Sequence, residues 1–402
     1  MINFICVSVN NWEKRRARKQ QFMLHLSLIN DVGRVLYVEP PLNLARVILF
    51  PFRELRDCQS RQRWLRAILF KPLKVSDKLL VFTPLFLVPF SFRIQALYNF
   101  NLYILHFFLK GLSYRLKLDN TVLWLYHPLD VALLKWLKEI KCSCFDWAEE
   151  WSQYFSELSF KRRQSILRKE AELIKKSDIV FTVSRALLQR AKEINPNSYQ
   201  LLDGTIPELF DSSFRALPAD MRDIPSPIIG YSGTISFRVD AELLLESCRA
   251  LPQCSFVFVG EVLKLNPAAI SSLKAQPNMY FLGAKEFKQI PHYLMNFDLC
   301  IIPYLEDITI ATPTKIFDYL ATGLPIVSTV FPDSGLFQGL ILTASSRSEF
   351  VSMIKEALVE KDLNLPKKRI AMAFMNTWTK RAEEIICIVR QKILAKGLND
   401  TG

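Results

Sequence analysis

Short apolar runs alternate with longer polar or amphipathic stretches along the whole chain. This alternation is typical of buried parallel strands separated by helices. The predicted strands are Asn3–Val9, Val35–Glu39, Leu79–Thr83, Thr121–Tyr126, Cys142–Trp147, Asp178–Ser184, Ile228–Tyr231, Ser255–Gly260, Met279–Gly283, Leu299–Tyr304, Pro325–Thr329 and Gly339–Thr343. Because the chain has 402 residues, of which half are hydrophobic, we expect two α/β domains, each with a doubly wound parallel sheet.

One strand–loop–helix–strand unit, residues 299–329, carries the clearest candidate chemistry. A polar loop, Glu306–Thr314, separates the strand from a helix that should begin near Thr314 and end at Gly323. The free N–H groups at a helix start favour a phosphate. Lys315 and Asp318 lie three residues apart and so share one face of the helix. They are either ligand-binding groups or an exposed ion pair worth less than about 1 kcal/mol, and this spacing alone favours the ion pair.

The amino-acid sequence of this unit favours the ligand-binding alternative. The string PTKIFDYLATGLPIV, residues 313–327, resembles the nucleotide-sugar-binding segment of GT-B-fold glycosyltransferases in the retaining, family 4-like group. The resemblance implies that Thr312, Pro313 and Thr314 hold the donor diphosphate and that Asp318 binds the ribose. Asp318 stands where relatives have Glu, and Ile310 stands where many have a second Glu. The resemblance also implies a metal-independent enzyme whose donor is its substrate, with no cofactor.

The first loop of the second half resembles a second donor-binding element. Ser232, Gly233 and Thr234 follow the strand Ile228–Tyr231, and Arg238 comes shortly after. The resemblance implies that Gly233 and Thr234 approach the donor phosphates. A guanidinium can hold two phosphate oxygens, so Arg238 is a candidate catalytic residue together with Lys315. The alternative is an Arg that faces solvent.

Polar residues also follow predicted strands of the first half. His127 follows Thr121–Tyr126 directly and either contacts the donor sugar, as in many relatives, or caps the next helix. Asp146 and Glu150 are candidates on the acceptor side, or begin a helix. Arg18 and Gln21 match a string near the first helix of the family, and either contact a phosphate or belong to a solvated basic helix start.

Positive charge is concentrated near the N-terminus. Residues 1–120 hold 19 Lys/Arg and seven Asp/Glu, whereas the other 282 residues hold 33 and 32. Residues 46–74 mix cations with bulky apolar residues, which predicts either a segment in the interface of an anionic membrane or a helix that packs its apolar side on the domain. Leu79–Leu109 is interrupted by prolines and polar residues, so we expect no membrane span there. Positive charge is the only feature that suggests nucleic acid, so we expect no such partner.

We therefore expect a GT-B protein with two Rossmann-like domains facing a cleft. Residues 1–206 form the acceptor-binding domain, 207–375 the nucleotide-sugar domain, and 376–402 a helix that crosses back. The expected function is transfer of a sugar, with retention, from a nucleotide-diphosphate sugar to a lipid-linked or polysaccharide acceptor in cell-surface polysaccharide synthesis. The protein should be cytoplasmic and peripheral on the inner face of the membrane. The alternative is a non-catalytic GT-B scaffold in a polysaccharide-assembly complex.

Overall fold

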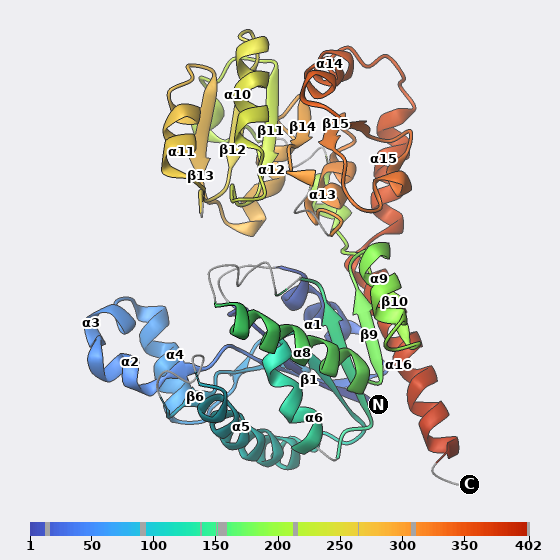
Figure 1. Ribbon diagram of the computed structural model, residues 1–402. Coiled ribbons are helices and arrows are strands. Elements are labelled where there is room, and N and C mark those ends of the chain that lie inside the picture. The colour runs from blue at the N-terminus through green and yellow to red at the C-terminus, as the bar shows by residue number, and fades with distance from the viewer. Residues whose placement is uncertain are drawn as a thin grey trace. The chain divides into compact units, whose positions relative to one another are not determined.

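The computed structural model describes residues 1–12, 17–88, 94–136, 139–149, 151, 159–211, 216–263, 265–306 and 311–399. The chain divides into two compact units (Figure 1). Unit 1 contains Met1–Val183, Leu187–Leu201 and the chain from Arg381 onward, and unit 2 contains Ser184–Ala186 and Leu202–Lys380. Among the described residues, no helix combines the length and the apolar character that a bilayer span requires.

Unit 1 contains an eight-stranded sheet in the order β10-β9-β8-β7-β1-β2-β5-β4. Its strands are β1 (Ile2–Val7), β2 (Val32–Val38), β4 (Leu73–Lys74), β5 (Leu79–Phe82), β7 (Thr121–Leu125), β8 (Cys142–Trp147), β9 (Ile179–Thr182) and β10 (Ser198–Gln200). All neighbours pair in parallel except β4 with β5. A separate two-stranded sheet pairs β3 (Leu42–Asn43) with β6 (Leu85–Phe86). The strand order reverses between β1 and β7, and ligands of such sheets bind at the carboxyl ends of the strands at this point.

The helices of unit 1 follow the predicted alternation. They are α1 (Arg18–Leu28), α2 (Leu44–Leu49), α3 (Pro51–Glu54), α4 (Cys58–Ile68), α5 (Gln95–Arg115), the 3₁₀ helix η1 (Pro128–Val131), α6 (Ala132–Trp136), α8 (Phe160–Lys176) and α9 (Arg185–Lys192). The last helix, α16 (Trp378–Asn399), begins in unit 2 and continues into unit 1. The predicted helix after His127 thus begins as a 3₁₀ turn, and a prediction for residues 137 and 138 lies outside the described residues.

Unit 2 contains a fully parallel sheet in the order β13-β12-β11-β14-β15-β16. Its strands are β11 (Ile228–Ser232), β12 (Ser255–Val259), β13 (Met279–Gly283), β14 (Leu299–Ile302), β15 (Ile326–Thr329) and β16 (Leu342–Ala344). Numbered within the unit, this is the order 3-2-1-4-5-6 of the Rossmann sheet, and it reverses between β11 and β14. The predicted parallel, doubly wound sheet is confirmed here.

The helices of unit 2 cover this sheet. They are α10 (Ala241–Ala250), α11 (Pro267–Lys274), α12 (Ile290–Leu294), α13 (Lys315–Thr322), α14 (Arg347–Ala357) and α15 (Leu365–Met375), with 3₁₀ helices η2 (Pro207–Phe210), η4 (Ala219–Met221), η5 (Phe287–Gln289) and η7 (Ser334–Phe337). The predicted break in the last helical stretch falls between α15 and α16.

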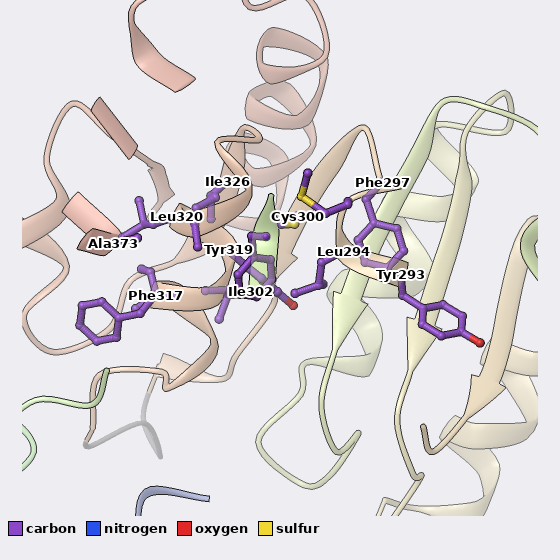
Figure 2. Close-up of a cluster of buried hydrophobic side chains, with 14 of the residues drawn as sticks. Tyr293, Leu294, Phe297, Cys300, Ile302, Phe317, Tyr319, Leu320, Ile326 and Ala373 are labelled. Carbon is purple, nitrogen blue, oxygen red and sulfur yellow. The ribbon is translucent and has the colours of Figure 1, made fainter. Parts of the chain in front are cut away.

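Helix α13 packs on the sheet through the apolar residues that predicted it. Figure 2 shows Phe317, Tyr319 and Leu320 in the cluster that also contains Ile302 of β14 and Ile326 of β15. All three of these α13 side chains are fully buried. The helix ends as predicted at Gly323, whose φ of 75° is the left-handed conformation that glycine adopts without strain. Helix α13 is therefore held firmly, with its first turn at the carboxyl edge of β14.

Candidate functional site

Two loops of unit 2 meet where the strand order reverses. The loop after β11 runs through Gly233 and Arg238, and the chain after β14 begins with Pro303, Tyr304 and Leu305. The Asp240 amide donates to the Pro303 carbonyl at 2.9 Å, and the Leu305 amide donates to the Arg238 carbonyl at 2.8 Å. These bonds hold the Arg238 backbone beside the chain that leaves β14, which the predicted donor site requires.

Glycine is needed at two positions of this edge. A Cβ atom at Gly260, after β12, would lie 2.0 Å from the Gly233 carbonyl oxygen. A Cβ atom at Gly233 would lie 2.9 Å from Lys315 Nζ, and the φ of Gly233 is 129°, which side chains rarely adopt. Gly233 therefore leaves the space that the Lys315 ammonium occupies.

The Lys315 side chain lies across the end of β11. Its Nζ is 3.5 Å from the centroid of the Tyr231 ring and 5.0 Å from that of Tyr304. The nitrogen is inaccessible to solvent, although part of the residue remains exposed, and within the described chain no acceptor completes a well-formed hydrogen bond with it. Ring faces attract a cation but do not replace a carboxylate. A positive charge on this nitrogen would thus be buried without a carboxylate partner among the described residues.

The electrostatics of the cluster penalise a positive charge on Lys315 as long as no anion lies beside it. Burial lowers the pKa of Lys315, and the nearby Arg238 cation lowers it further, while Tyr304 opposes both. Burial alone would raise the pKa of Tyr304, but Lys315, the Tyr231 hydroxyl and Arg238 together outweigh it, so that the pKa of Tyr304 is lowered. Lys315 and Arg238 therefore act on the same small region, where an anion would be favoured by both.

The N-cap residue of α13 leaves room for a ligand, because its side chain does not cap the helix. Thr314 at the N-cap is helical and exposed, and its side chain makes no capping bond. The Ile316 amide does donate to the Pro313 carbonyl at 3.0 Å. The Ser232 amide donates to the Tyr319 hydroxyl at 2.8 Å, which ties the helix to the end of β11. Thr312 is buried and donates to Asp333 Oδ2 at 3.3 Å.

Asp318 turns away from Lys315. Its Oδ1 accepts a hydrogen bond from Thr205 Oγ1 at 2.6 Å. Burial raises its pKa to about 6; Thr205 lowers this value and Asp203 raises it. Both Lys315 and Asp318 are described, and they form no ion pair with each other, so the alternative prediction of an exposed pair is wrong. The predicted position Ile310 lies outside the described residues.

In unit 1, two of the acceptor-side candidates bind each other. Arg18 donates to Asp146 through Nε, at 3.0 Å to Oδ2, and through a terminal nitrogen, at 2.9 Å to Oδ1. Arg18 is 6% exposed and the Asp146 side chain is 0% exposed. Lys19 pairs with Glu149 at 3.0 Å. Gln21 is also buried, and its amide has no partner among the described residues. The alternative prediction of a solvated helix start is therefore wrong. Candidate Glu150 lies outside the described residues.

His127 caps the turn that follows β7. Its Nδ1 accepts the Leu129 amide at 3.2 Å, and its ring packs edge-on against Trp151 with centroids 4.5 Å apart. Burial lowers its pKa to about 4; Lys19 lowers it too and Glu149 opposes both. At neutral pH the ring is thus uncharged, and since Nδ1 accepts a hydrogen bond, the ring proton is on Nε2. Capping is observed, and a contact with the donor sugar stays a prediction.

Sequence reasoning missed the residues that surround the predicted ones. Tyr231, Tyr304 and Thr205 all contact Lys315 or Asp318. Tyr231 and Tyr304 lie at or just after the carboxyl ends of β11 and β14, and this position was a usable signal. Thr205 carries no such signal, because it lies outside both strands. Over the described ranges, no group of three or more His, Cys, Asp or Glu residues is arranged to hold a metal ion.

Comparison with known sequences supports a glycosyltransferase assignment for part of the chain. Residues 226–359 match the family model described as "Glycosyl transferases group 1". A Bacillus subtilis protein with the name "Putative teichuronic acid biosynthesis glycosyltransferase TuaH" is 26% identical over 219 residues, which cover 52% of this chain and 55% of TuaH. The chain thus spans about half the length of this relative. The matched family segment contains β11, α13 and Lys315.

Comparison with solved structures covers nearly the whole chain. A sucrose-phosphate synthase of Thermosynechococcus elongatus aligns with a TM-score of 0.70 at 14% identity, over 98% of this chain and 100% of the synthase. HepE of Anabaena, in complex with UDP and glucose, aligns with a TM-score of 0.66 at 13% identity, over 97% and 99%. The chain has the GT-B fold. The predicted fold and the resemblance to GT-B glycosyltransferases are confirmed.

Proposed function

We propose that this GT-B protein transfers a sugar from a nucleotide-diphosphate sugar to a lipid-linked or glycan acceptor, with retention of configuration. The name of TuaH refers to teichuronic acid biosynthesis, and HepE was solved with UDP and glucose. These names support a role in the synthesis of a cell-surface polysaccharide. The proposal needs no cofactor and no metal ion besides the donor substrate.

The observation that carries this proposal is the Lys315 ammonium. It is buried at the start of α13, at the point where the Rossmann sheet of unit 2 reverses its strand order. A buried cation without an anionic partner is costly, and such groups are retained where they serve a ligand. A diphosphate that approaches the uncapped helix start would supply the missing negative charge. Lysine has a flexible stem, so its ammonium can move from the Tyr231 ring to a phosphate oxygen.

In this mechanism the protein stabilises the leaving diphosphate. Negative charge grows on that group as its bond to the sugar breaks. Lys315, Arg238 and the start of α13 act on this charge, which is electrostatic catalysis. His127 is uncharged near neutral pH and therefore acts as a hydrogen-bond donor to a sugar hydroxyl rather than as a cation.

The cellular setting is a further part of the proposal. The excess of positive charge lies in residues 1–120, so an anionic membrane surface suits unit 1. We propose a cytoplasmic protein that is peripheral on the inner face of the membrane, where a lipid-linked acceptor would be available. Nucleic acid is not among the proposed partners.

A donor screen tests this function. The purified chain is incubated with UDP-, GDP- and dTDP-sugars and candidate acceptors, and release of the nucleoside diphosphate is measured. The proposal predicts acceptor-stimulated release with one class of donor. A non-catalytic scaffold predicts neither release nor saturable binding of any of the three nucleotides, and that result would overturn the proposal.

The pKa of Asp318 predicts a specific pH dependence. Because burial raises this pKa to about 6, Asp318 is ionised above that pH and becomes protonated below it. A carboxylate accepts hydrogen bonds from ribose hydroxyls more strongly than a carboxylic acid does, by about 1–2 kcal/mol, so the KM of the donor should rise about tenfold as the pH falls through 6. The measurement is the KM of the donor at a series of pH values.

Two variants sharpen this test. Asp318→Asn should raise the KM at neutral pH and remove the inflection near pH 6, while kcat changes less. Asp223→Asn removes an exposed carboxylate of the same unit and should leave the pH profile unchanged. An inflection that persists in Asp318→Asn would assign the titration to another group.

A further inference from the structure

Three short helices, α2 to α4, project from the rest of unit 1 (Figure 1). One side of this helical projection, residues 44–71, packs inward. Trp64 and Ala67 of α4 are buried in a small cluster with Leu42 and Leu85, the ends of the two-stranded sheet. Arg63 is also directed inward, and its Nε donates to Glu39 Oε2 at 2.9 Å. The inner side of the projection thus packs on, and forms hydrogen bonds with, the rest of unit 1.

The outer side of the projection is apolar as well. Phe52 is 94% exposed, and six further large apolar side chains are more than half exposed: Ile48, Leu49, Phe50, Leu65, Ile68 and Leu69. A helix that only packed its apolar side on the domain would bury these residues and leave a basic outer face. That alternative holds for α4 only in part, because Trp64 and Ala67 are buried on the domain whereas Leu65 and Ile68 are exposed. Contiguous exposed apolar side chains of this kind mark an interaction surface.

Charge identifies the kind of partner. Residues 44–71 contain seven Lys/Arg and two Asp/Glu. Both acidic residues are engaged within the projection, because Glu54 pairs with Arg46 at 2.8 Å and Asp57 accepts the Ser60 amide at 2.7 Å. The exposed cations Arg53, Arg56, Arg61 and Lys71 stand among the apolar side chains. Bulky apolar residues flanked by cations match the acyl boundary and phosphate layer of an anionic bilayer.

We infer that the helical projection is the membrane-docking element of this protein. Phe52, Leu49 and their apolar neighbours insert at the boundary of the acyl chains, and the surrounding arginines contact anionic headgroups. The inference deepens the proposed membrane location by naming the element that binds. It concerns binding alone, so it is tested without measuring sugar transfer.

Vesicle flotation tests this inference on the full chain. The wild-type protein should float with vesicles of equal parts phosphatidylglycerol and phosphatidylcholine and should bind pure phosphatidylcholine far more weakly. Ionic strength of about 1 M, at which charges are screened beyond about 3 Å, should weaken the binding. Phe52→Glu combined with Leu49→Glu should weaken it by about 10–100-fold, because each apolar insertion is replaced by an exposed like charge.

A matched control variant makes the result specific. Leu363→Glu changes a residue of unit 2 that is 85% exposed and should float like the wild type. The inference is overturned if the double variant floats as well as the wild type, or if the wild type binds no anionic vesicle. It is also overturned if light scattering shows that the wild type is a dimer and the double variant a monomer, since the surface then docks a second copy. Nucleoside diphosphate release by the same samples tests the proposed activity separately.

Discussion

Replacing Lys315 with methionine should lower kcat for sugar transfer by about 10²–10³-fold, the usual effect of removing one group that stabilises charge in a transition state. The same change should leave the free protein equally or more stable. Methionine fills a similar volume, and it removes a basic nitrogen that lies on the Tyr231 ring and contacts no carboxylate of the described residues. Steady-state kinetics and a thermal melt of the same preparation measure the two effects.

A loss of activity without a loss of stability is the signature of a group retained for its ligand. Lys288→Ala is the matched control, because Lys288 is an exposed lysine of the same unit. It should change neither quantity. If Lys315→Met unfolds the protein, the lysine is a structural residue; if it transfers sugar at the wild-type rate, the donor site lies elsewhere.

Arg18→Ala and Asp146→Ala should each reduce the free energy of unfolding of unit 1 by about 3–5 kcal/mol. Each variant leaves an uncompensated charge where the wild type has a doubly bonded, buried ion pair. Replacing both residues with apolar ones of similar size, Arg18→Met with Asp146→Leu, should cost much less than the two single changes together. Six of the seven tryptophans belong to unit 1, so denaturation followed by tryptophan fluorescence reports on this unit.

An exposed ion pair provides the comparison. Lys176 and Glu172 lie 2.6 Å apart on α8, but their side chains are 56% and 42% exposed. Lys176→Ala should therefore cost less than about 1 kcal/mol. If the single variants of the Arg18–Asp146 pair lower the free energy of unfolding by no more than this, the pair does not stabilise α1. Both residues would then remain ligand-binding candidates.

The sequence was most informative where apolar runs and turn residues agree. The strand β14, the helix α13 and the strand β15 were predicted because an unbroken apolar run, an apolar helix face and a Gly-x-Pro stop follow one another. Helix α11 was not predicted, since its residues 267–274 show little contrast between faces. The antiparallel pairing of β4 was not predicted either, because two residues carry no pattern.

The candidate site was predicted in outline, by position. Gly233, Arg238 and Lys315 were chosen because they follow a strand or begin a helix and because their segments resemble the donor-binding segments of GT-B glycosyltransferases. The structure places Lys315 beside Gly233 and within electrostatic reach of Arg238. Contacts between distant residues were beyond this reasoning. Arg18 and Asp146 are 128 positions apart, and Thr205 and Asp318 are 113 apart, so only the packed chain shows that these residues are bonded.

The sequence allowed two predictions for the outer surface of residues 44–71, for a similar reason. The sequence shows that apolar residues and cations are mixed in this segment, but a helix of this composition can direct its apolar residues either way. Trp64 and Ala67 occupy the inner side of α4, and this leaves Leu65 and Ile68 on the outer one. The structure therefore decides the orientation, which the composition alone could not.

In the proposed mechanism, the buried Lys315 nitrogen at the start of α13 binds the diphosphate of the donor. The most direct measurement is a calorimetric titration of UDP, GDP and dTDP into the wild-type protein and into Lys315→Met. We expect saturable binding of one nucleotide to the wild type, weakened at least about tenfold in the variant, because a charge-assisted hydrogen bond contributes about 1.5–3 kcal/mol. Equal affinity of the two proteins for that nucleotide, or no binding of any of the three to the wild type, would contradict the claim.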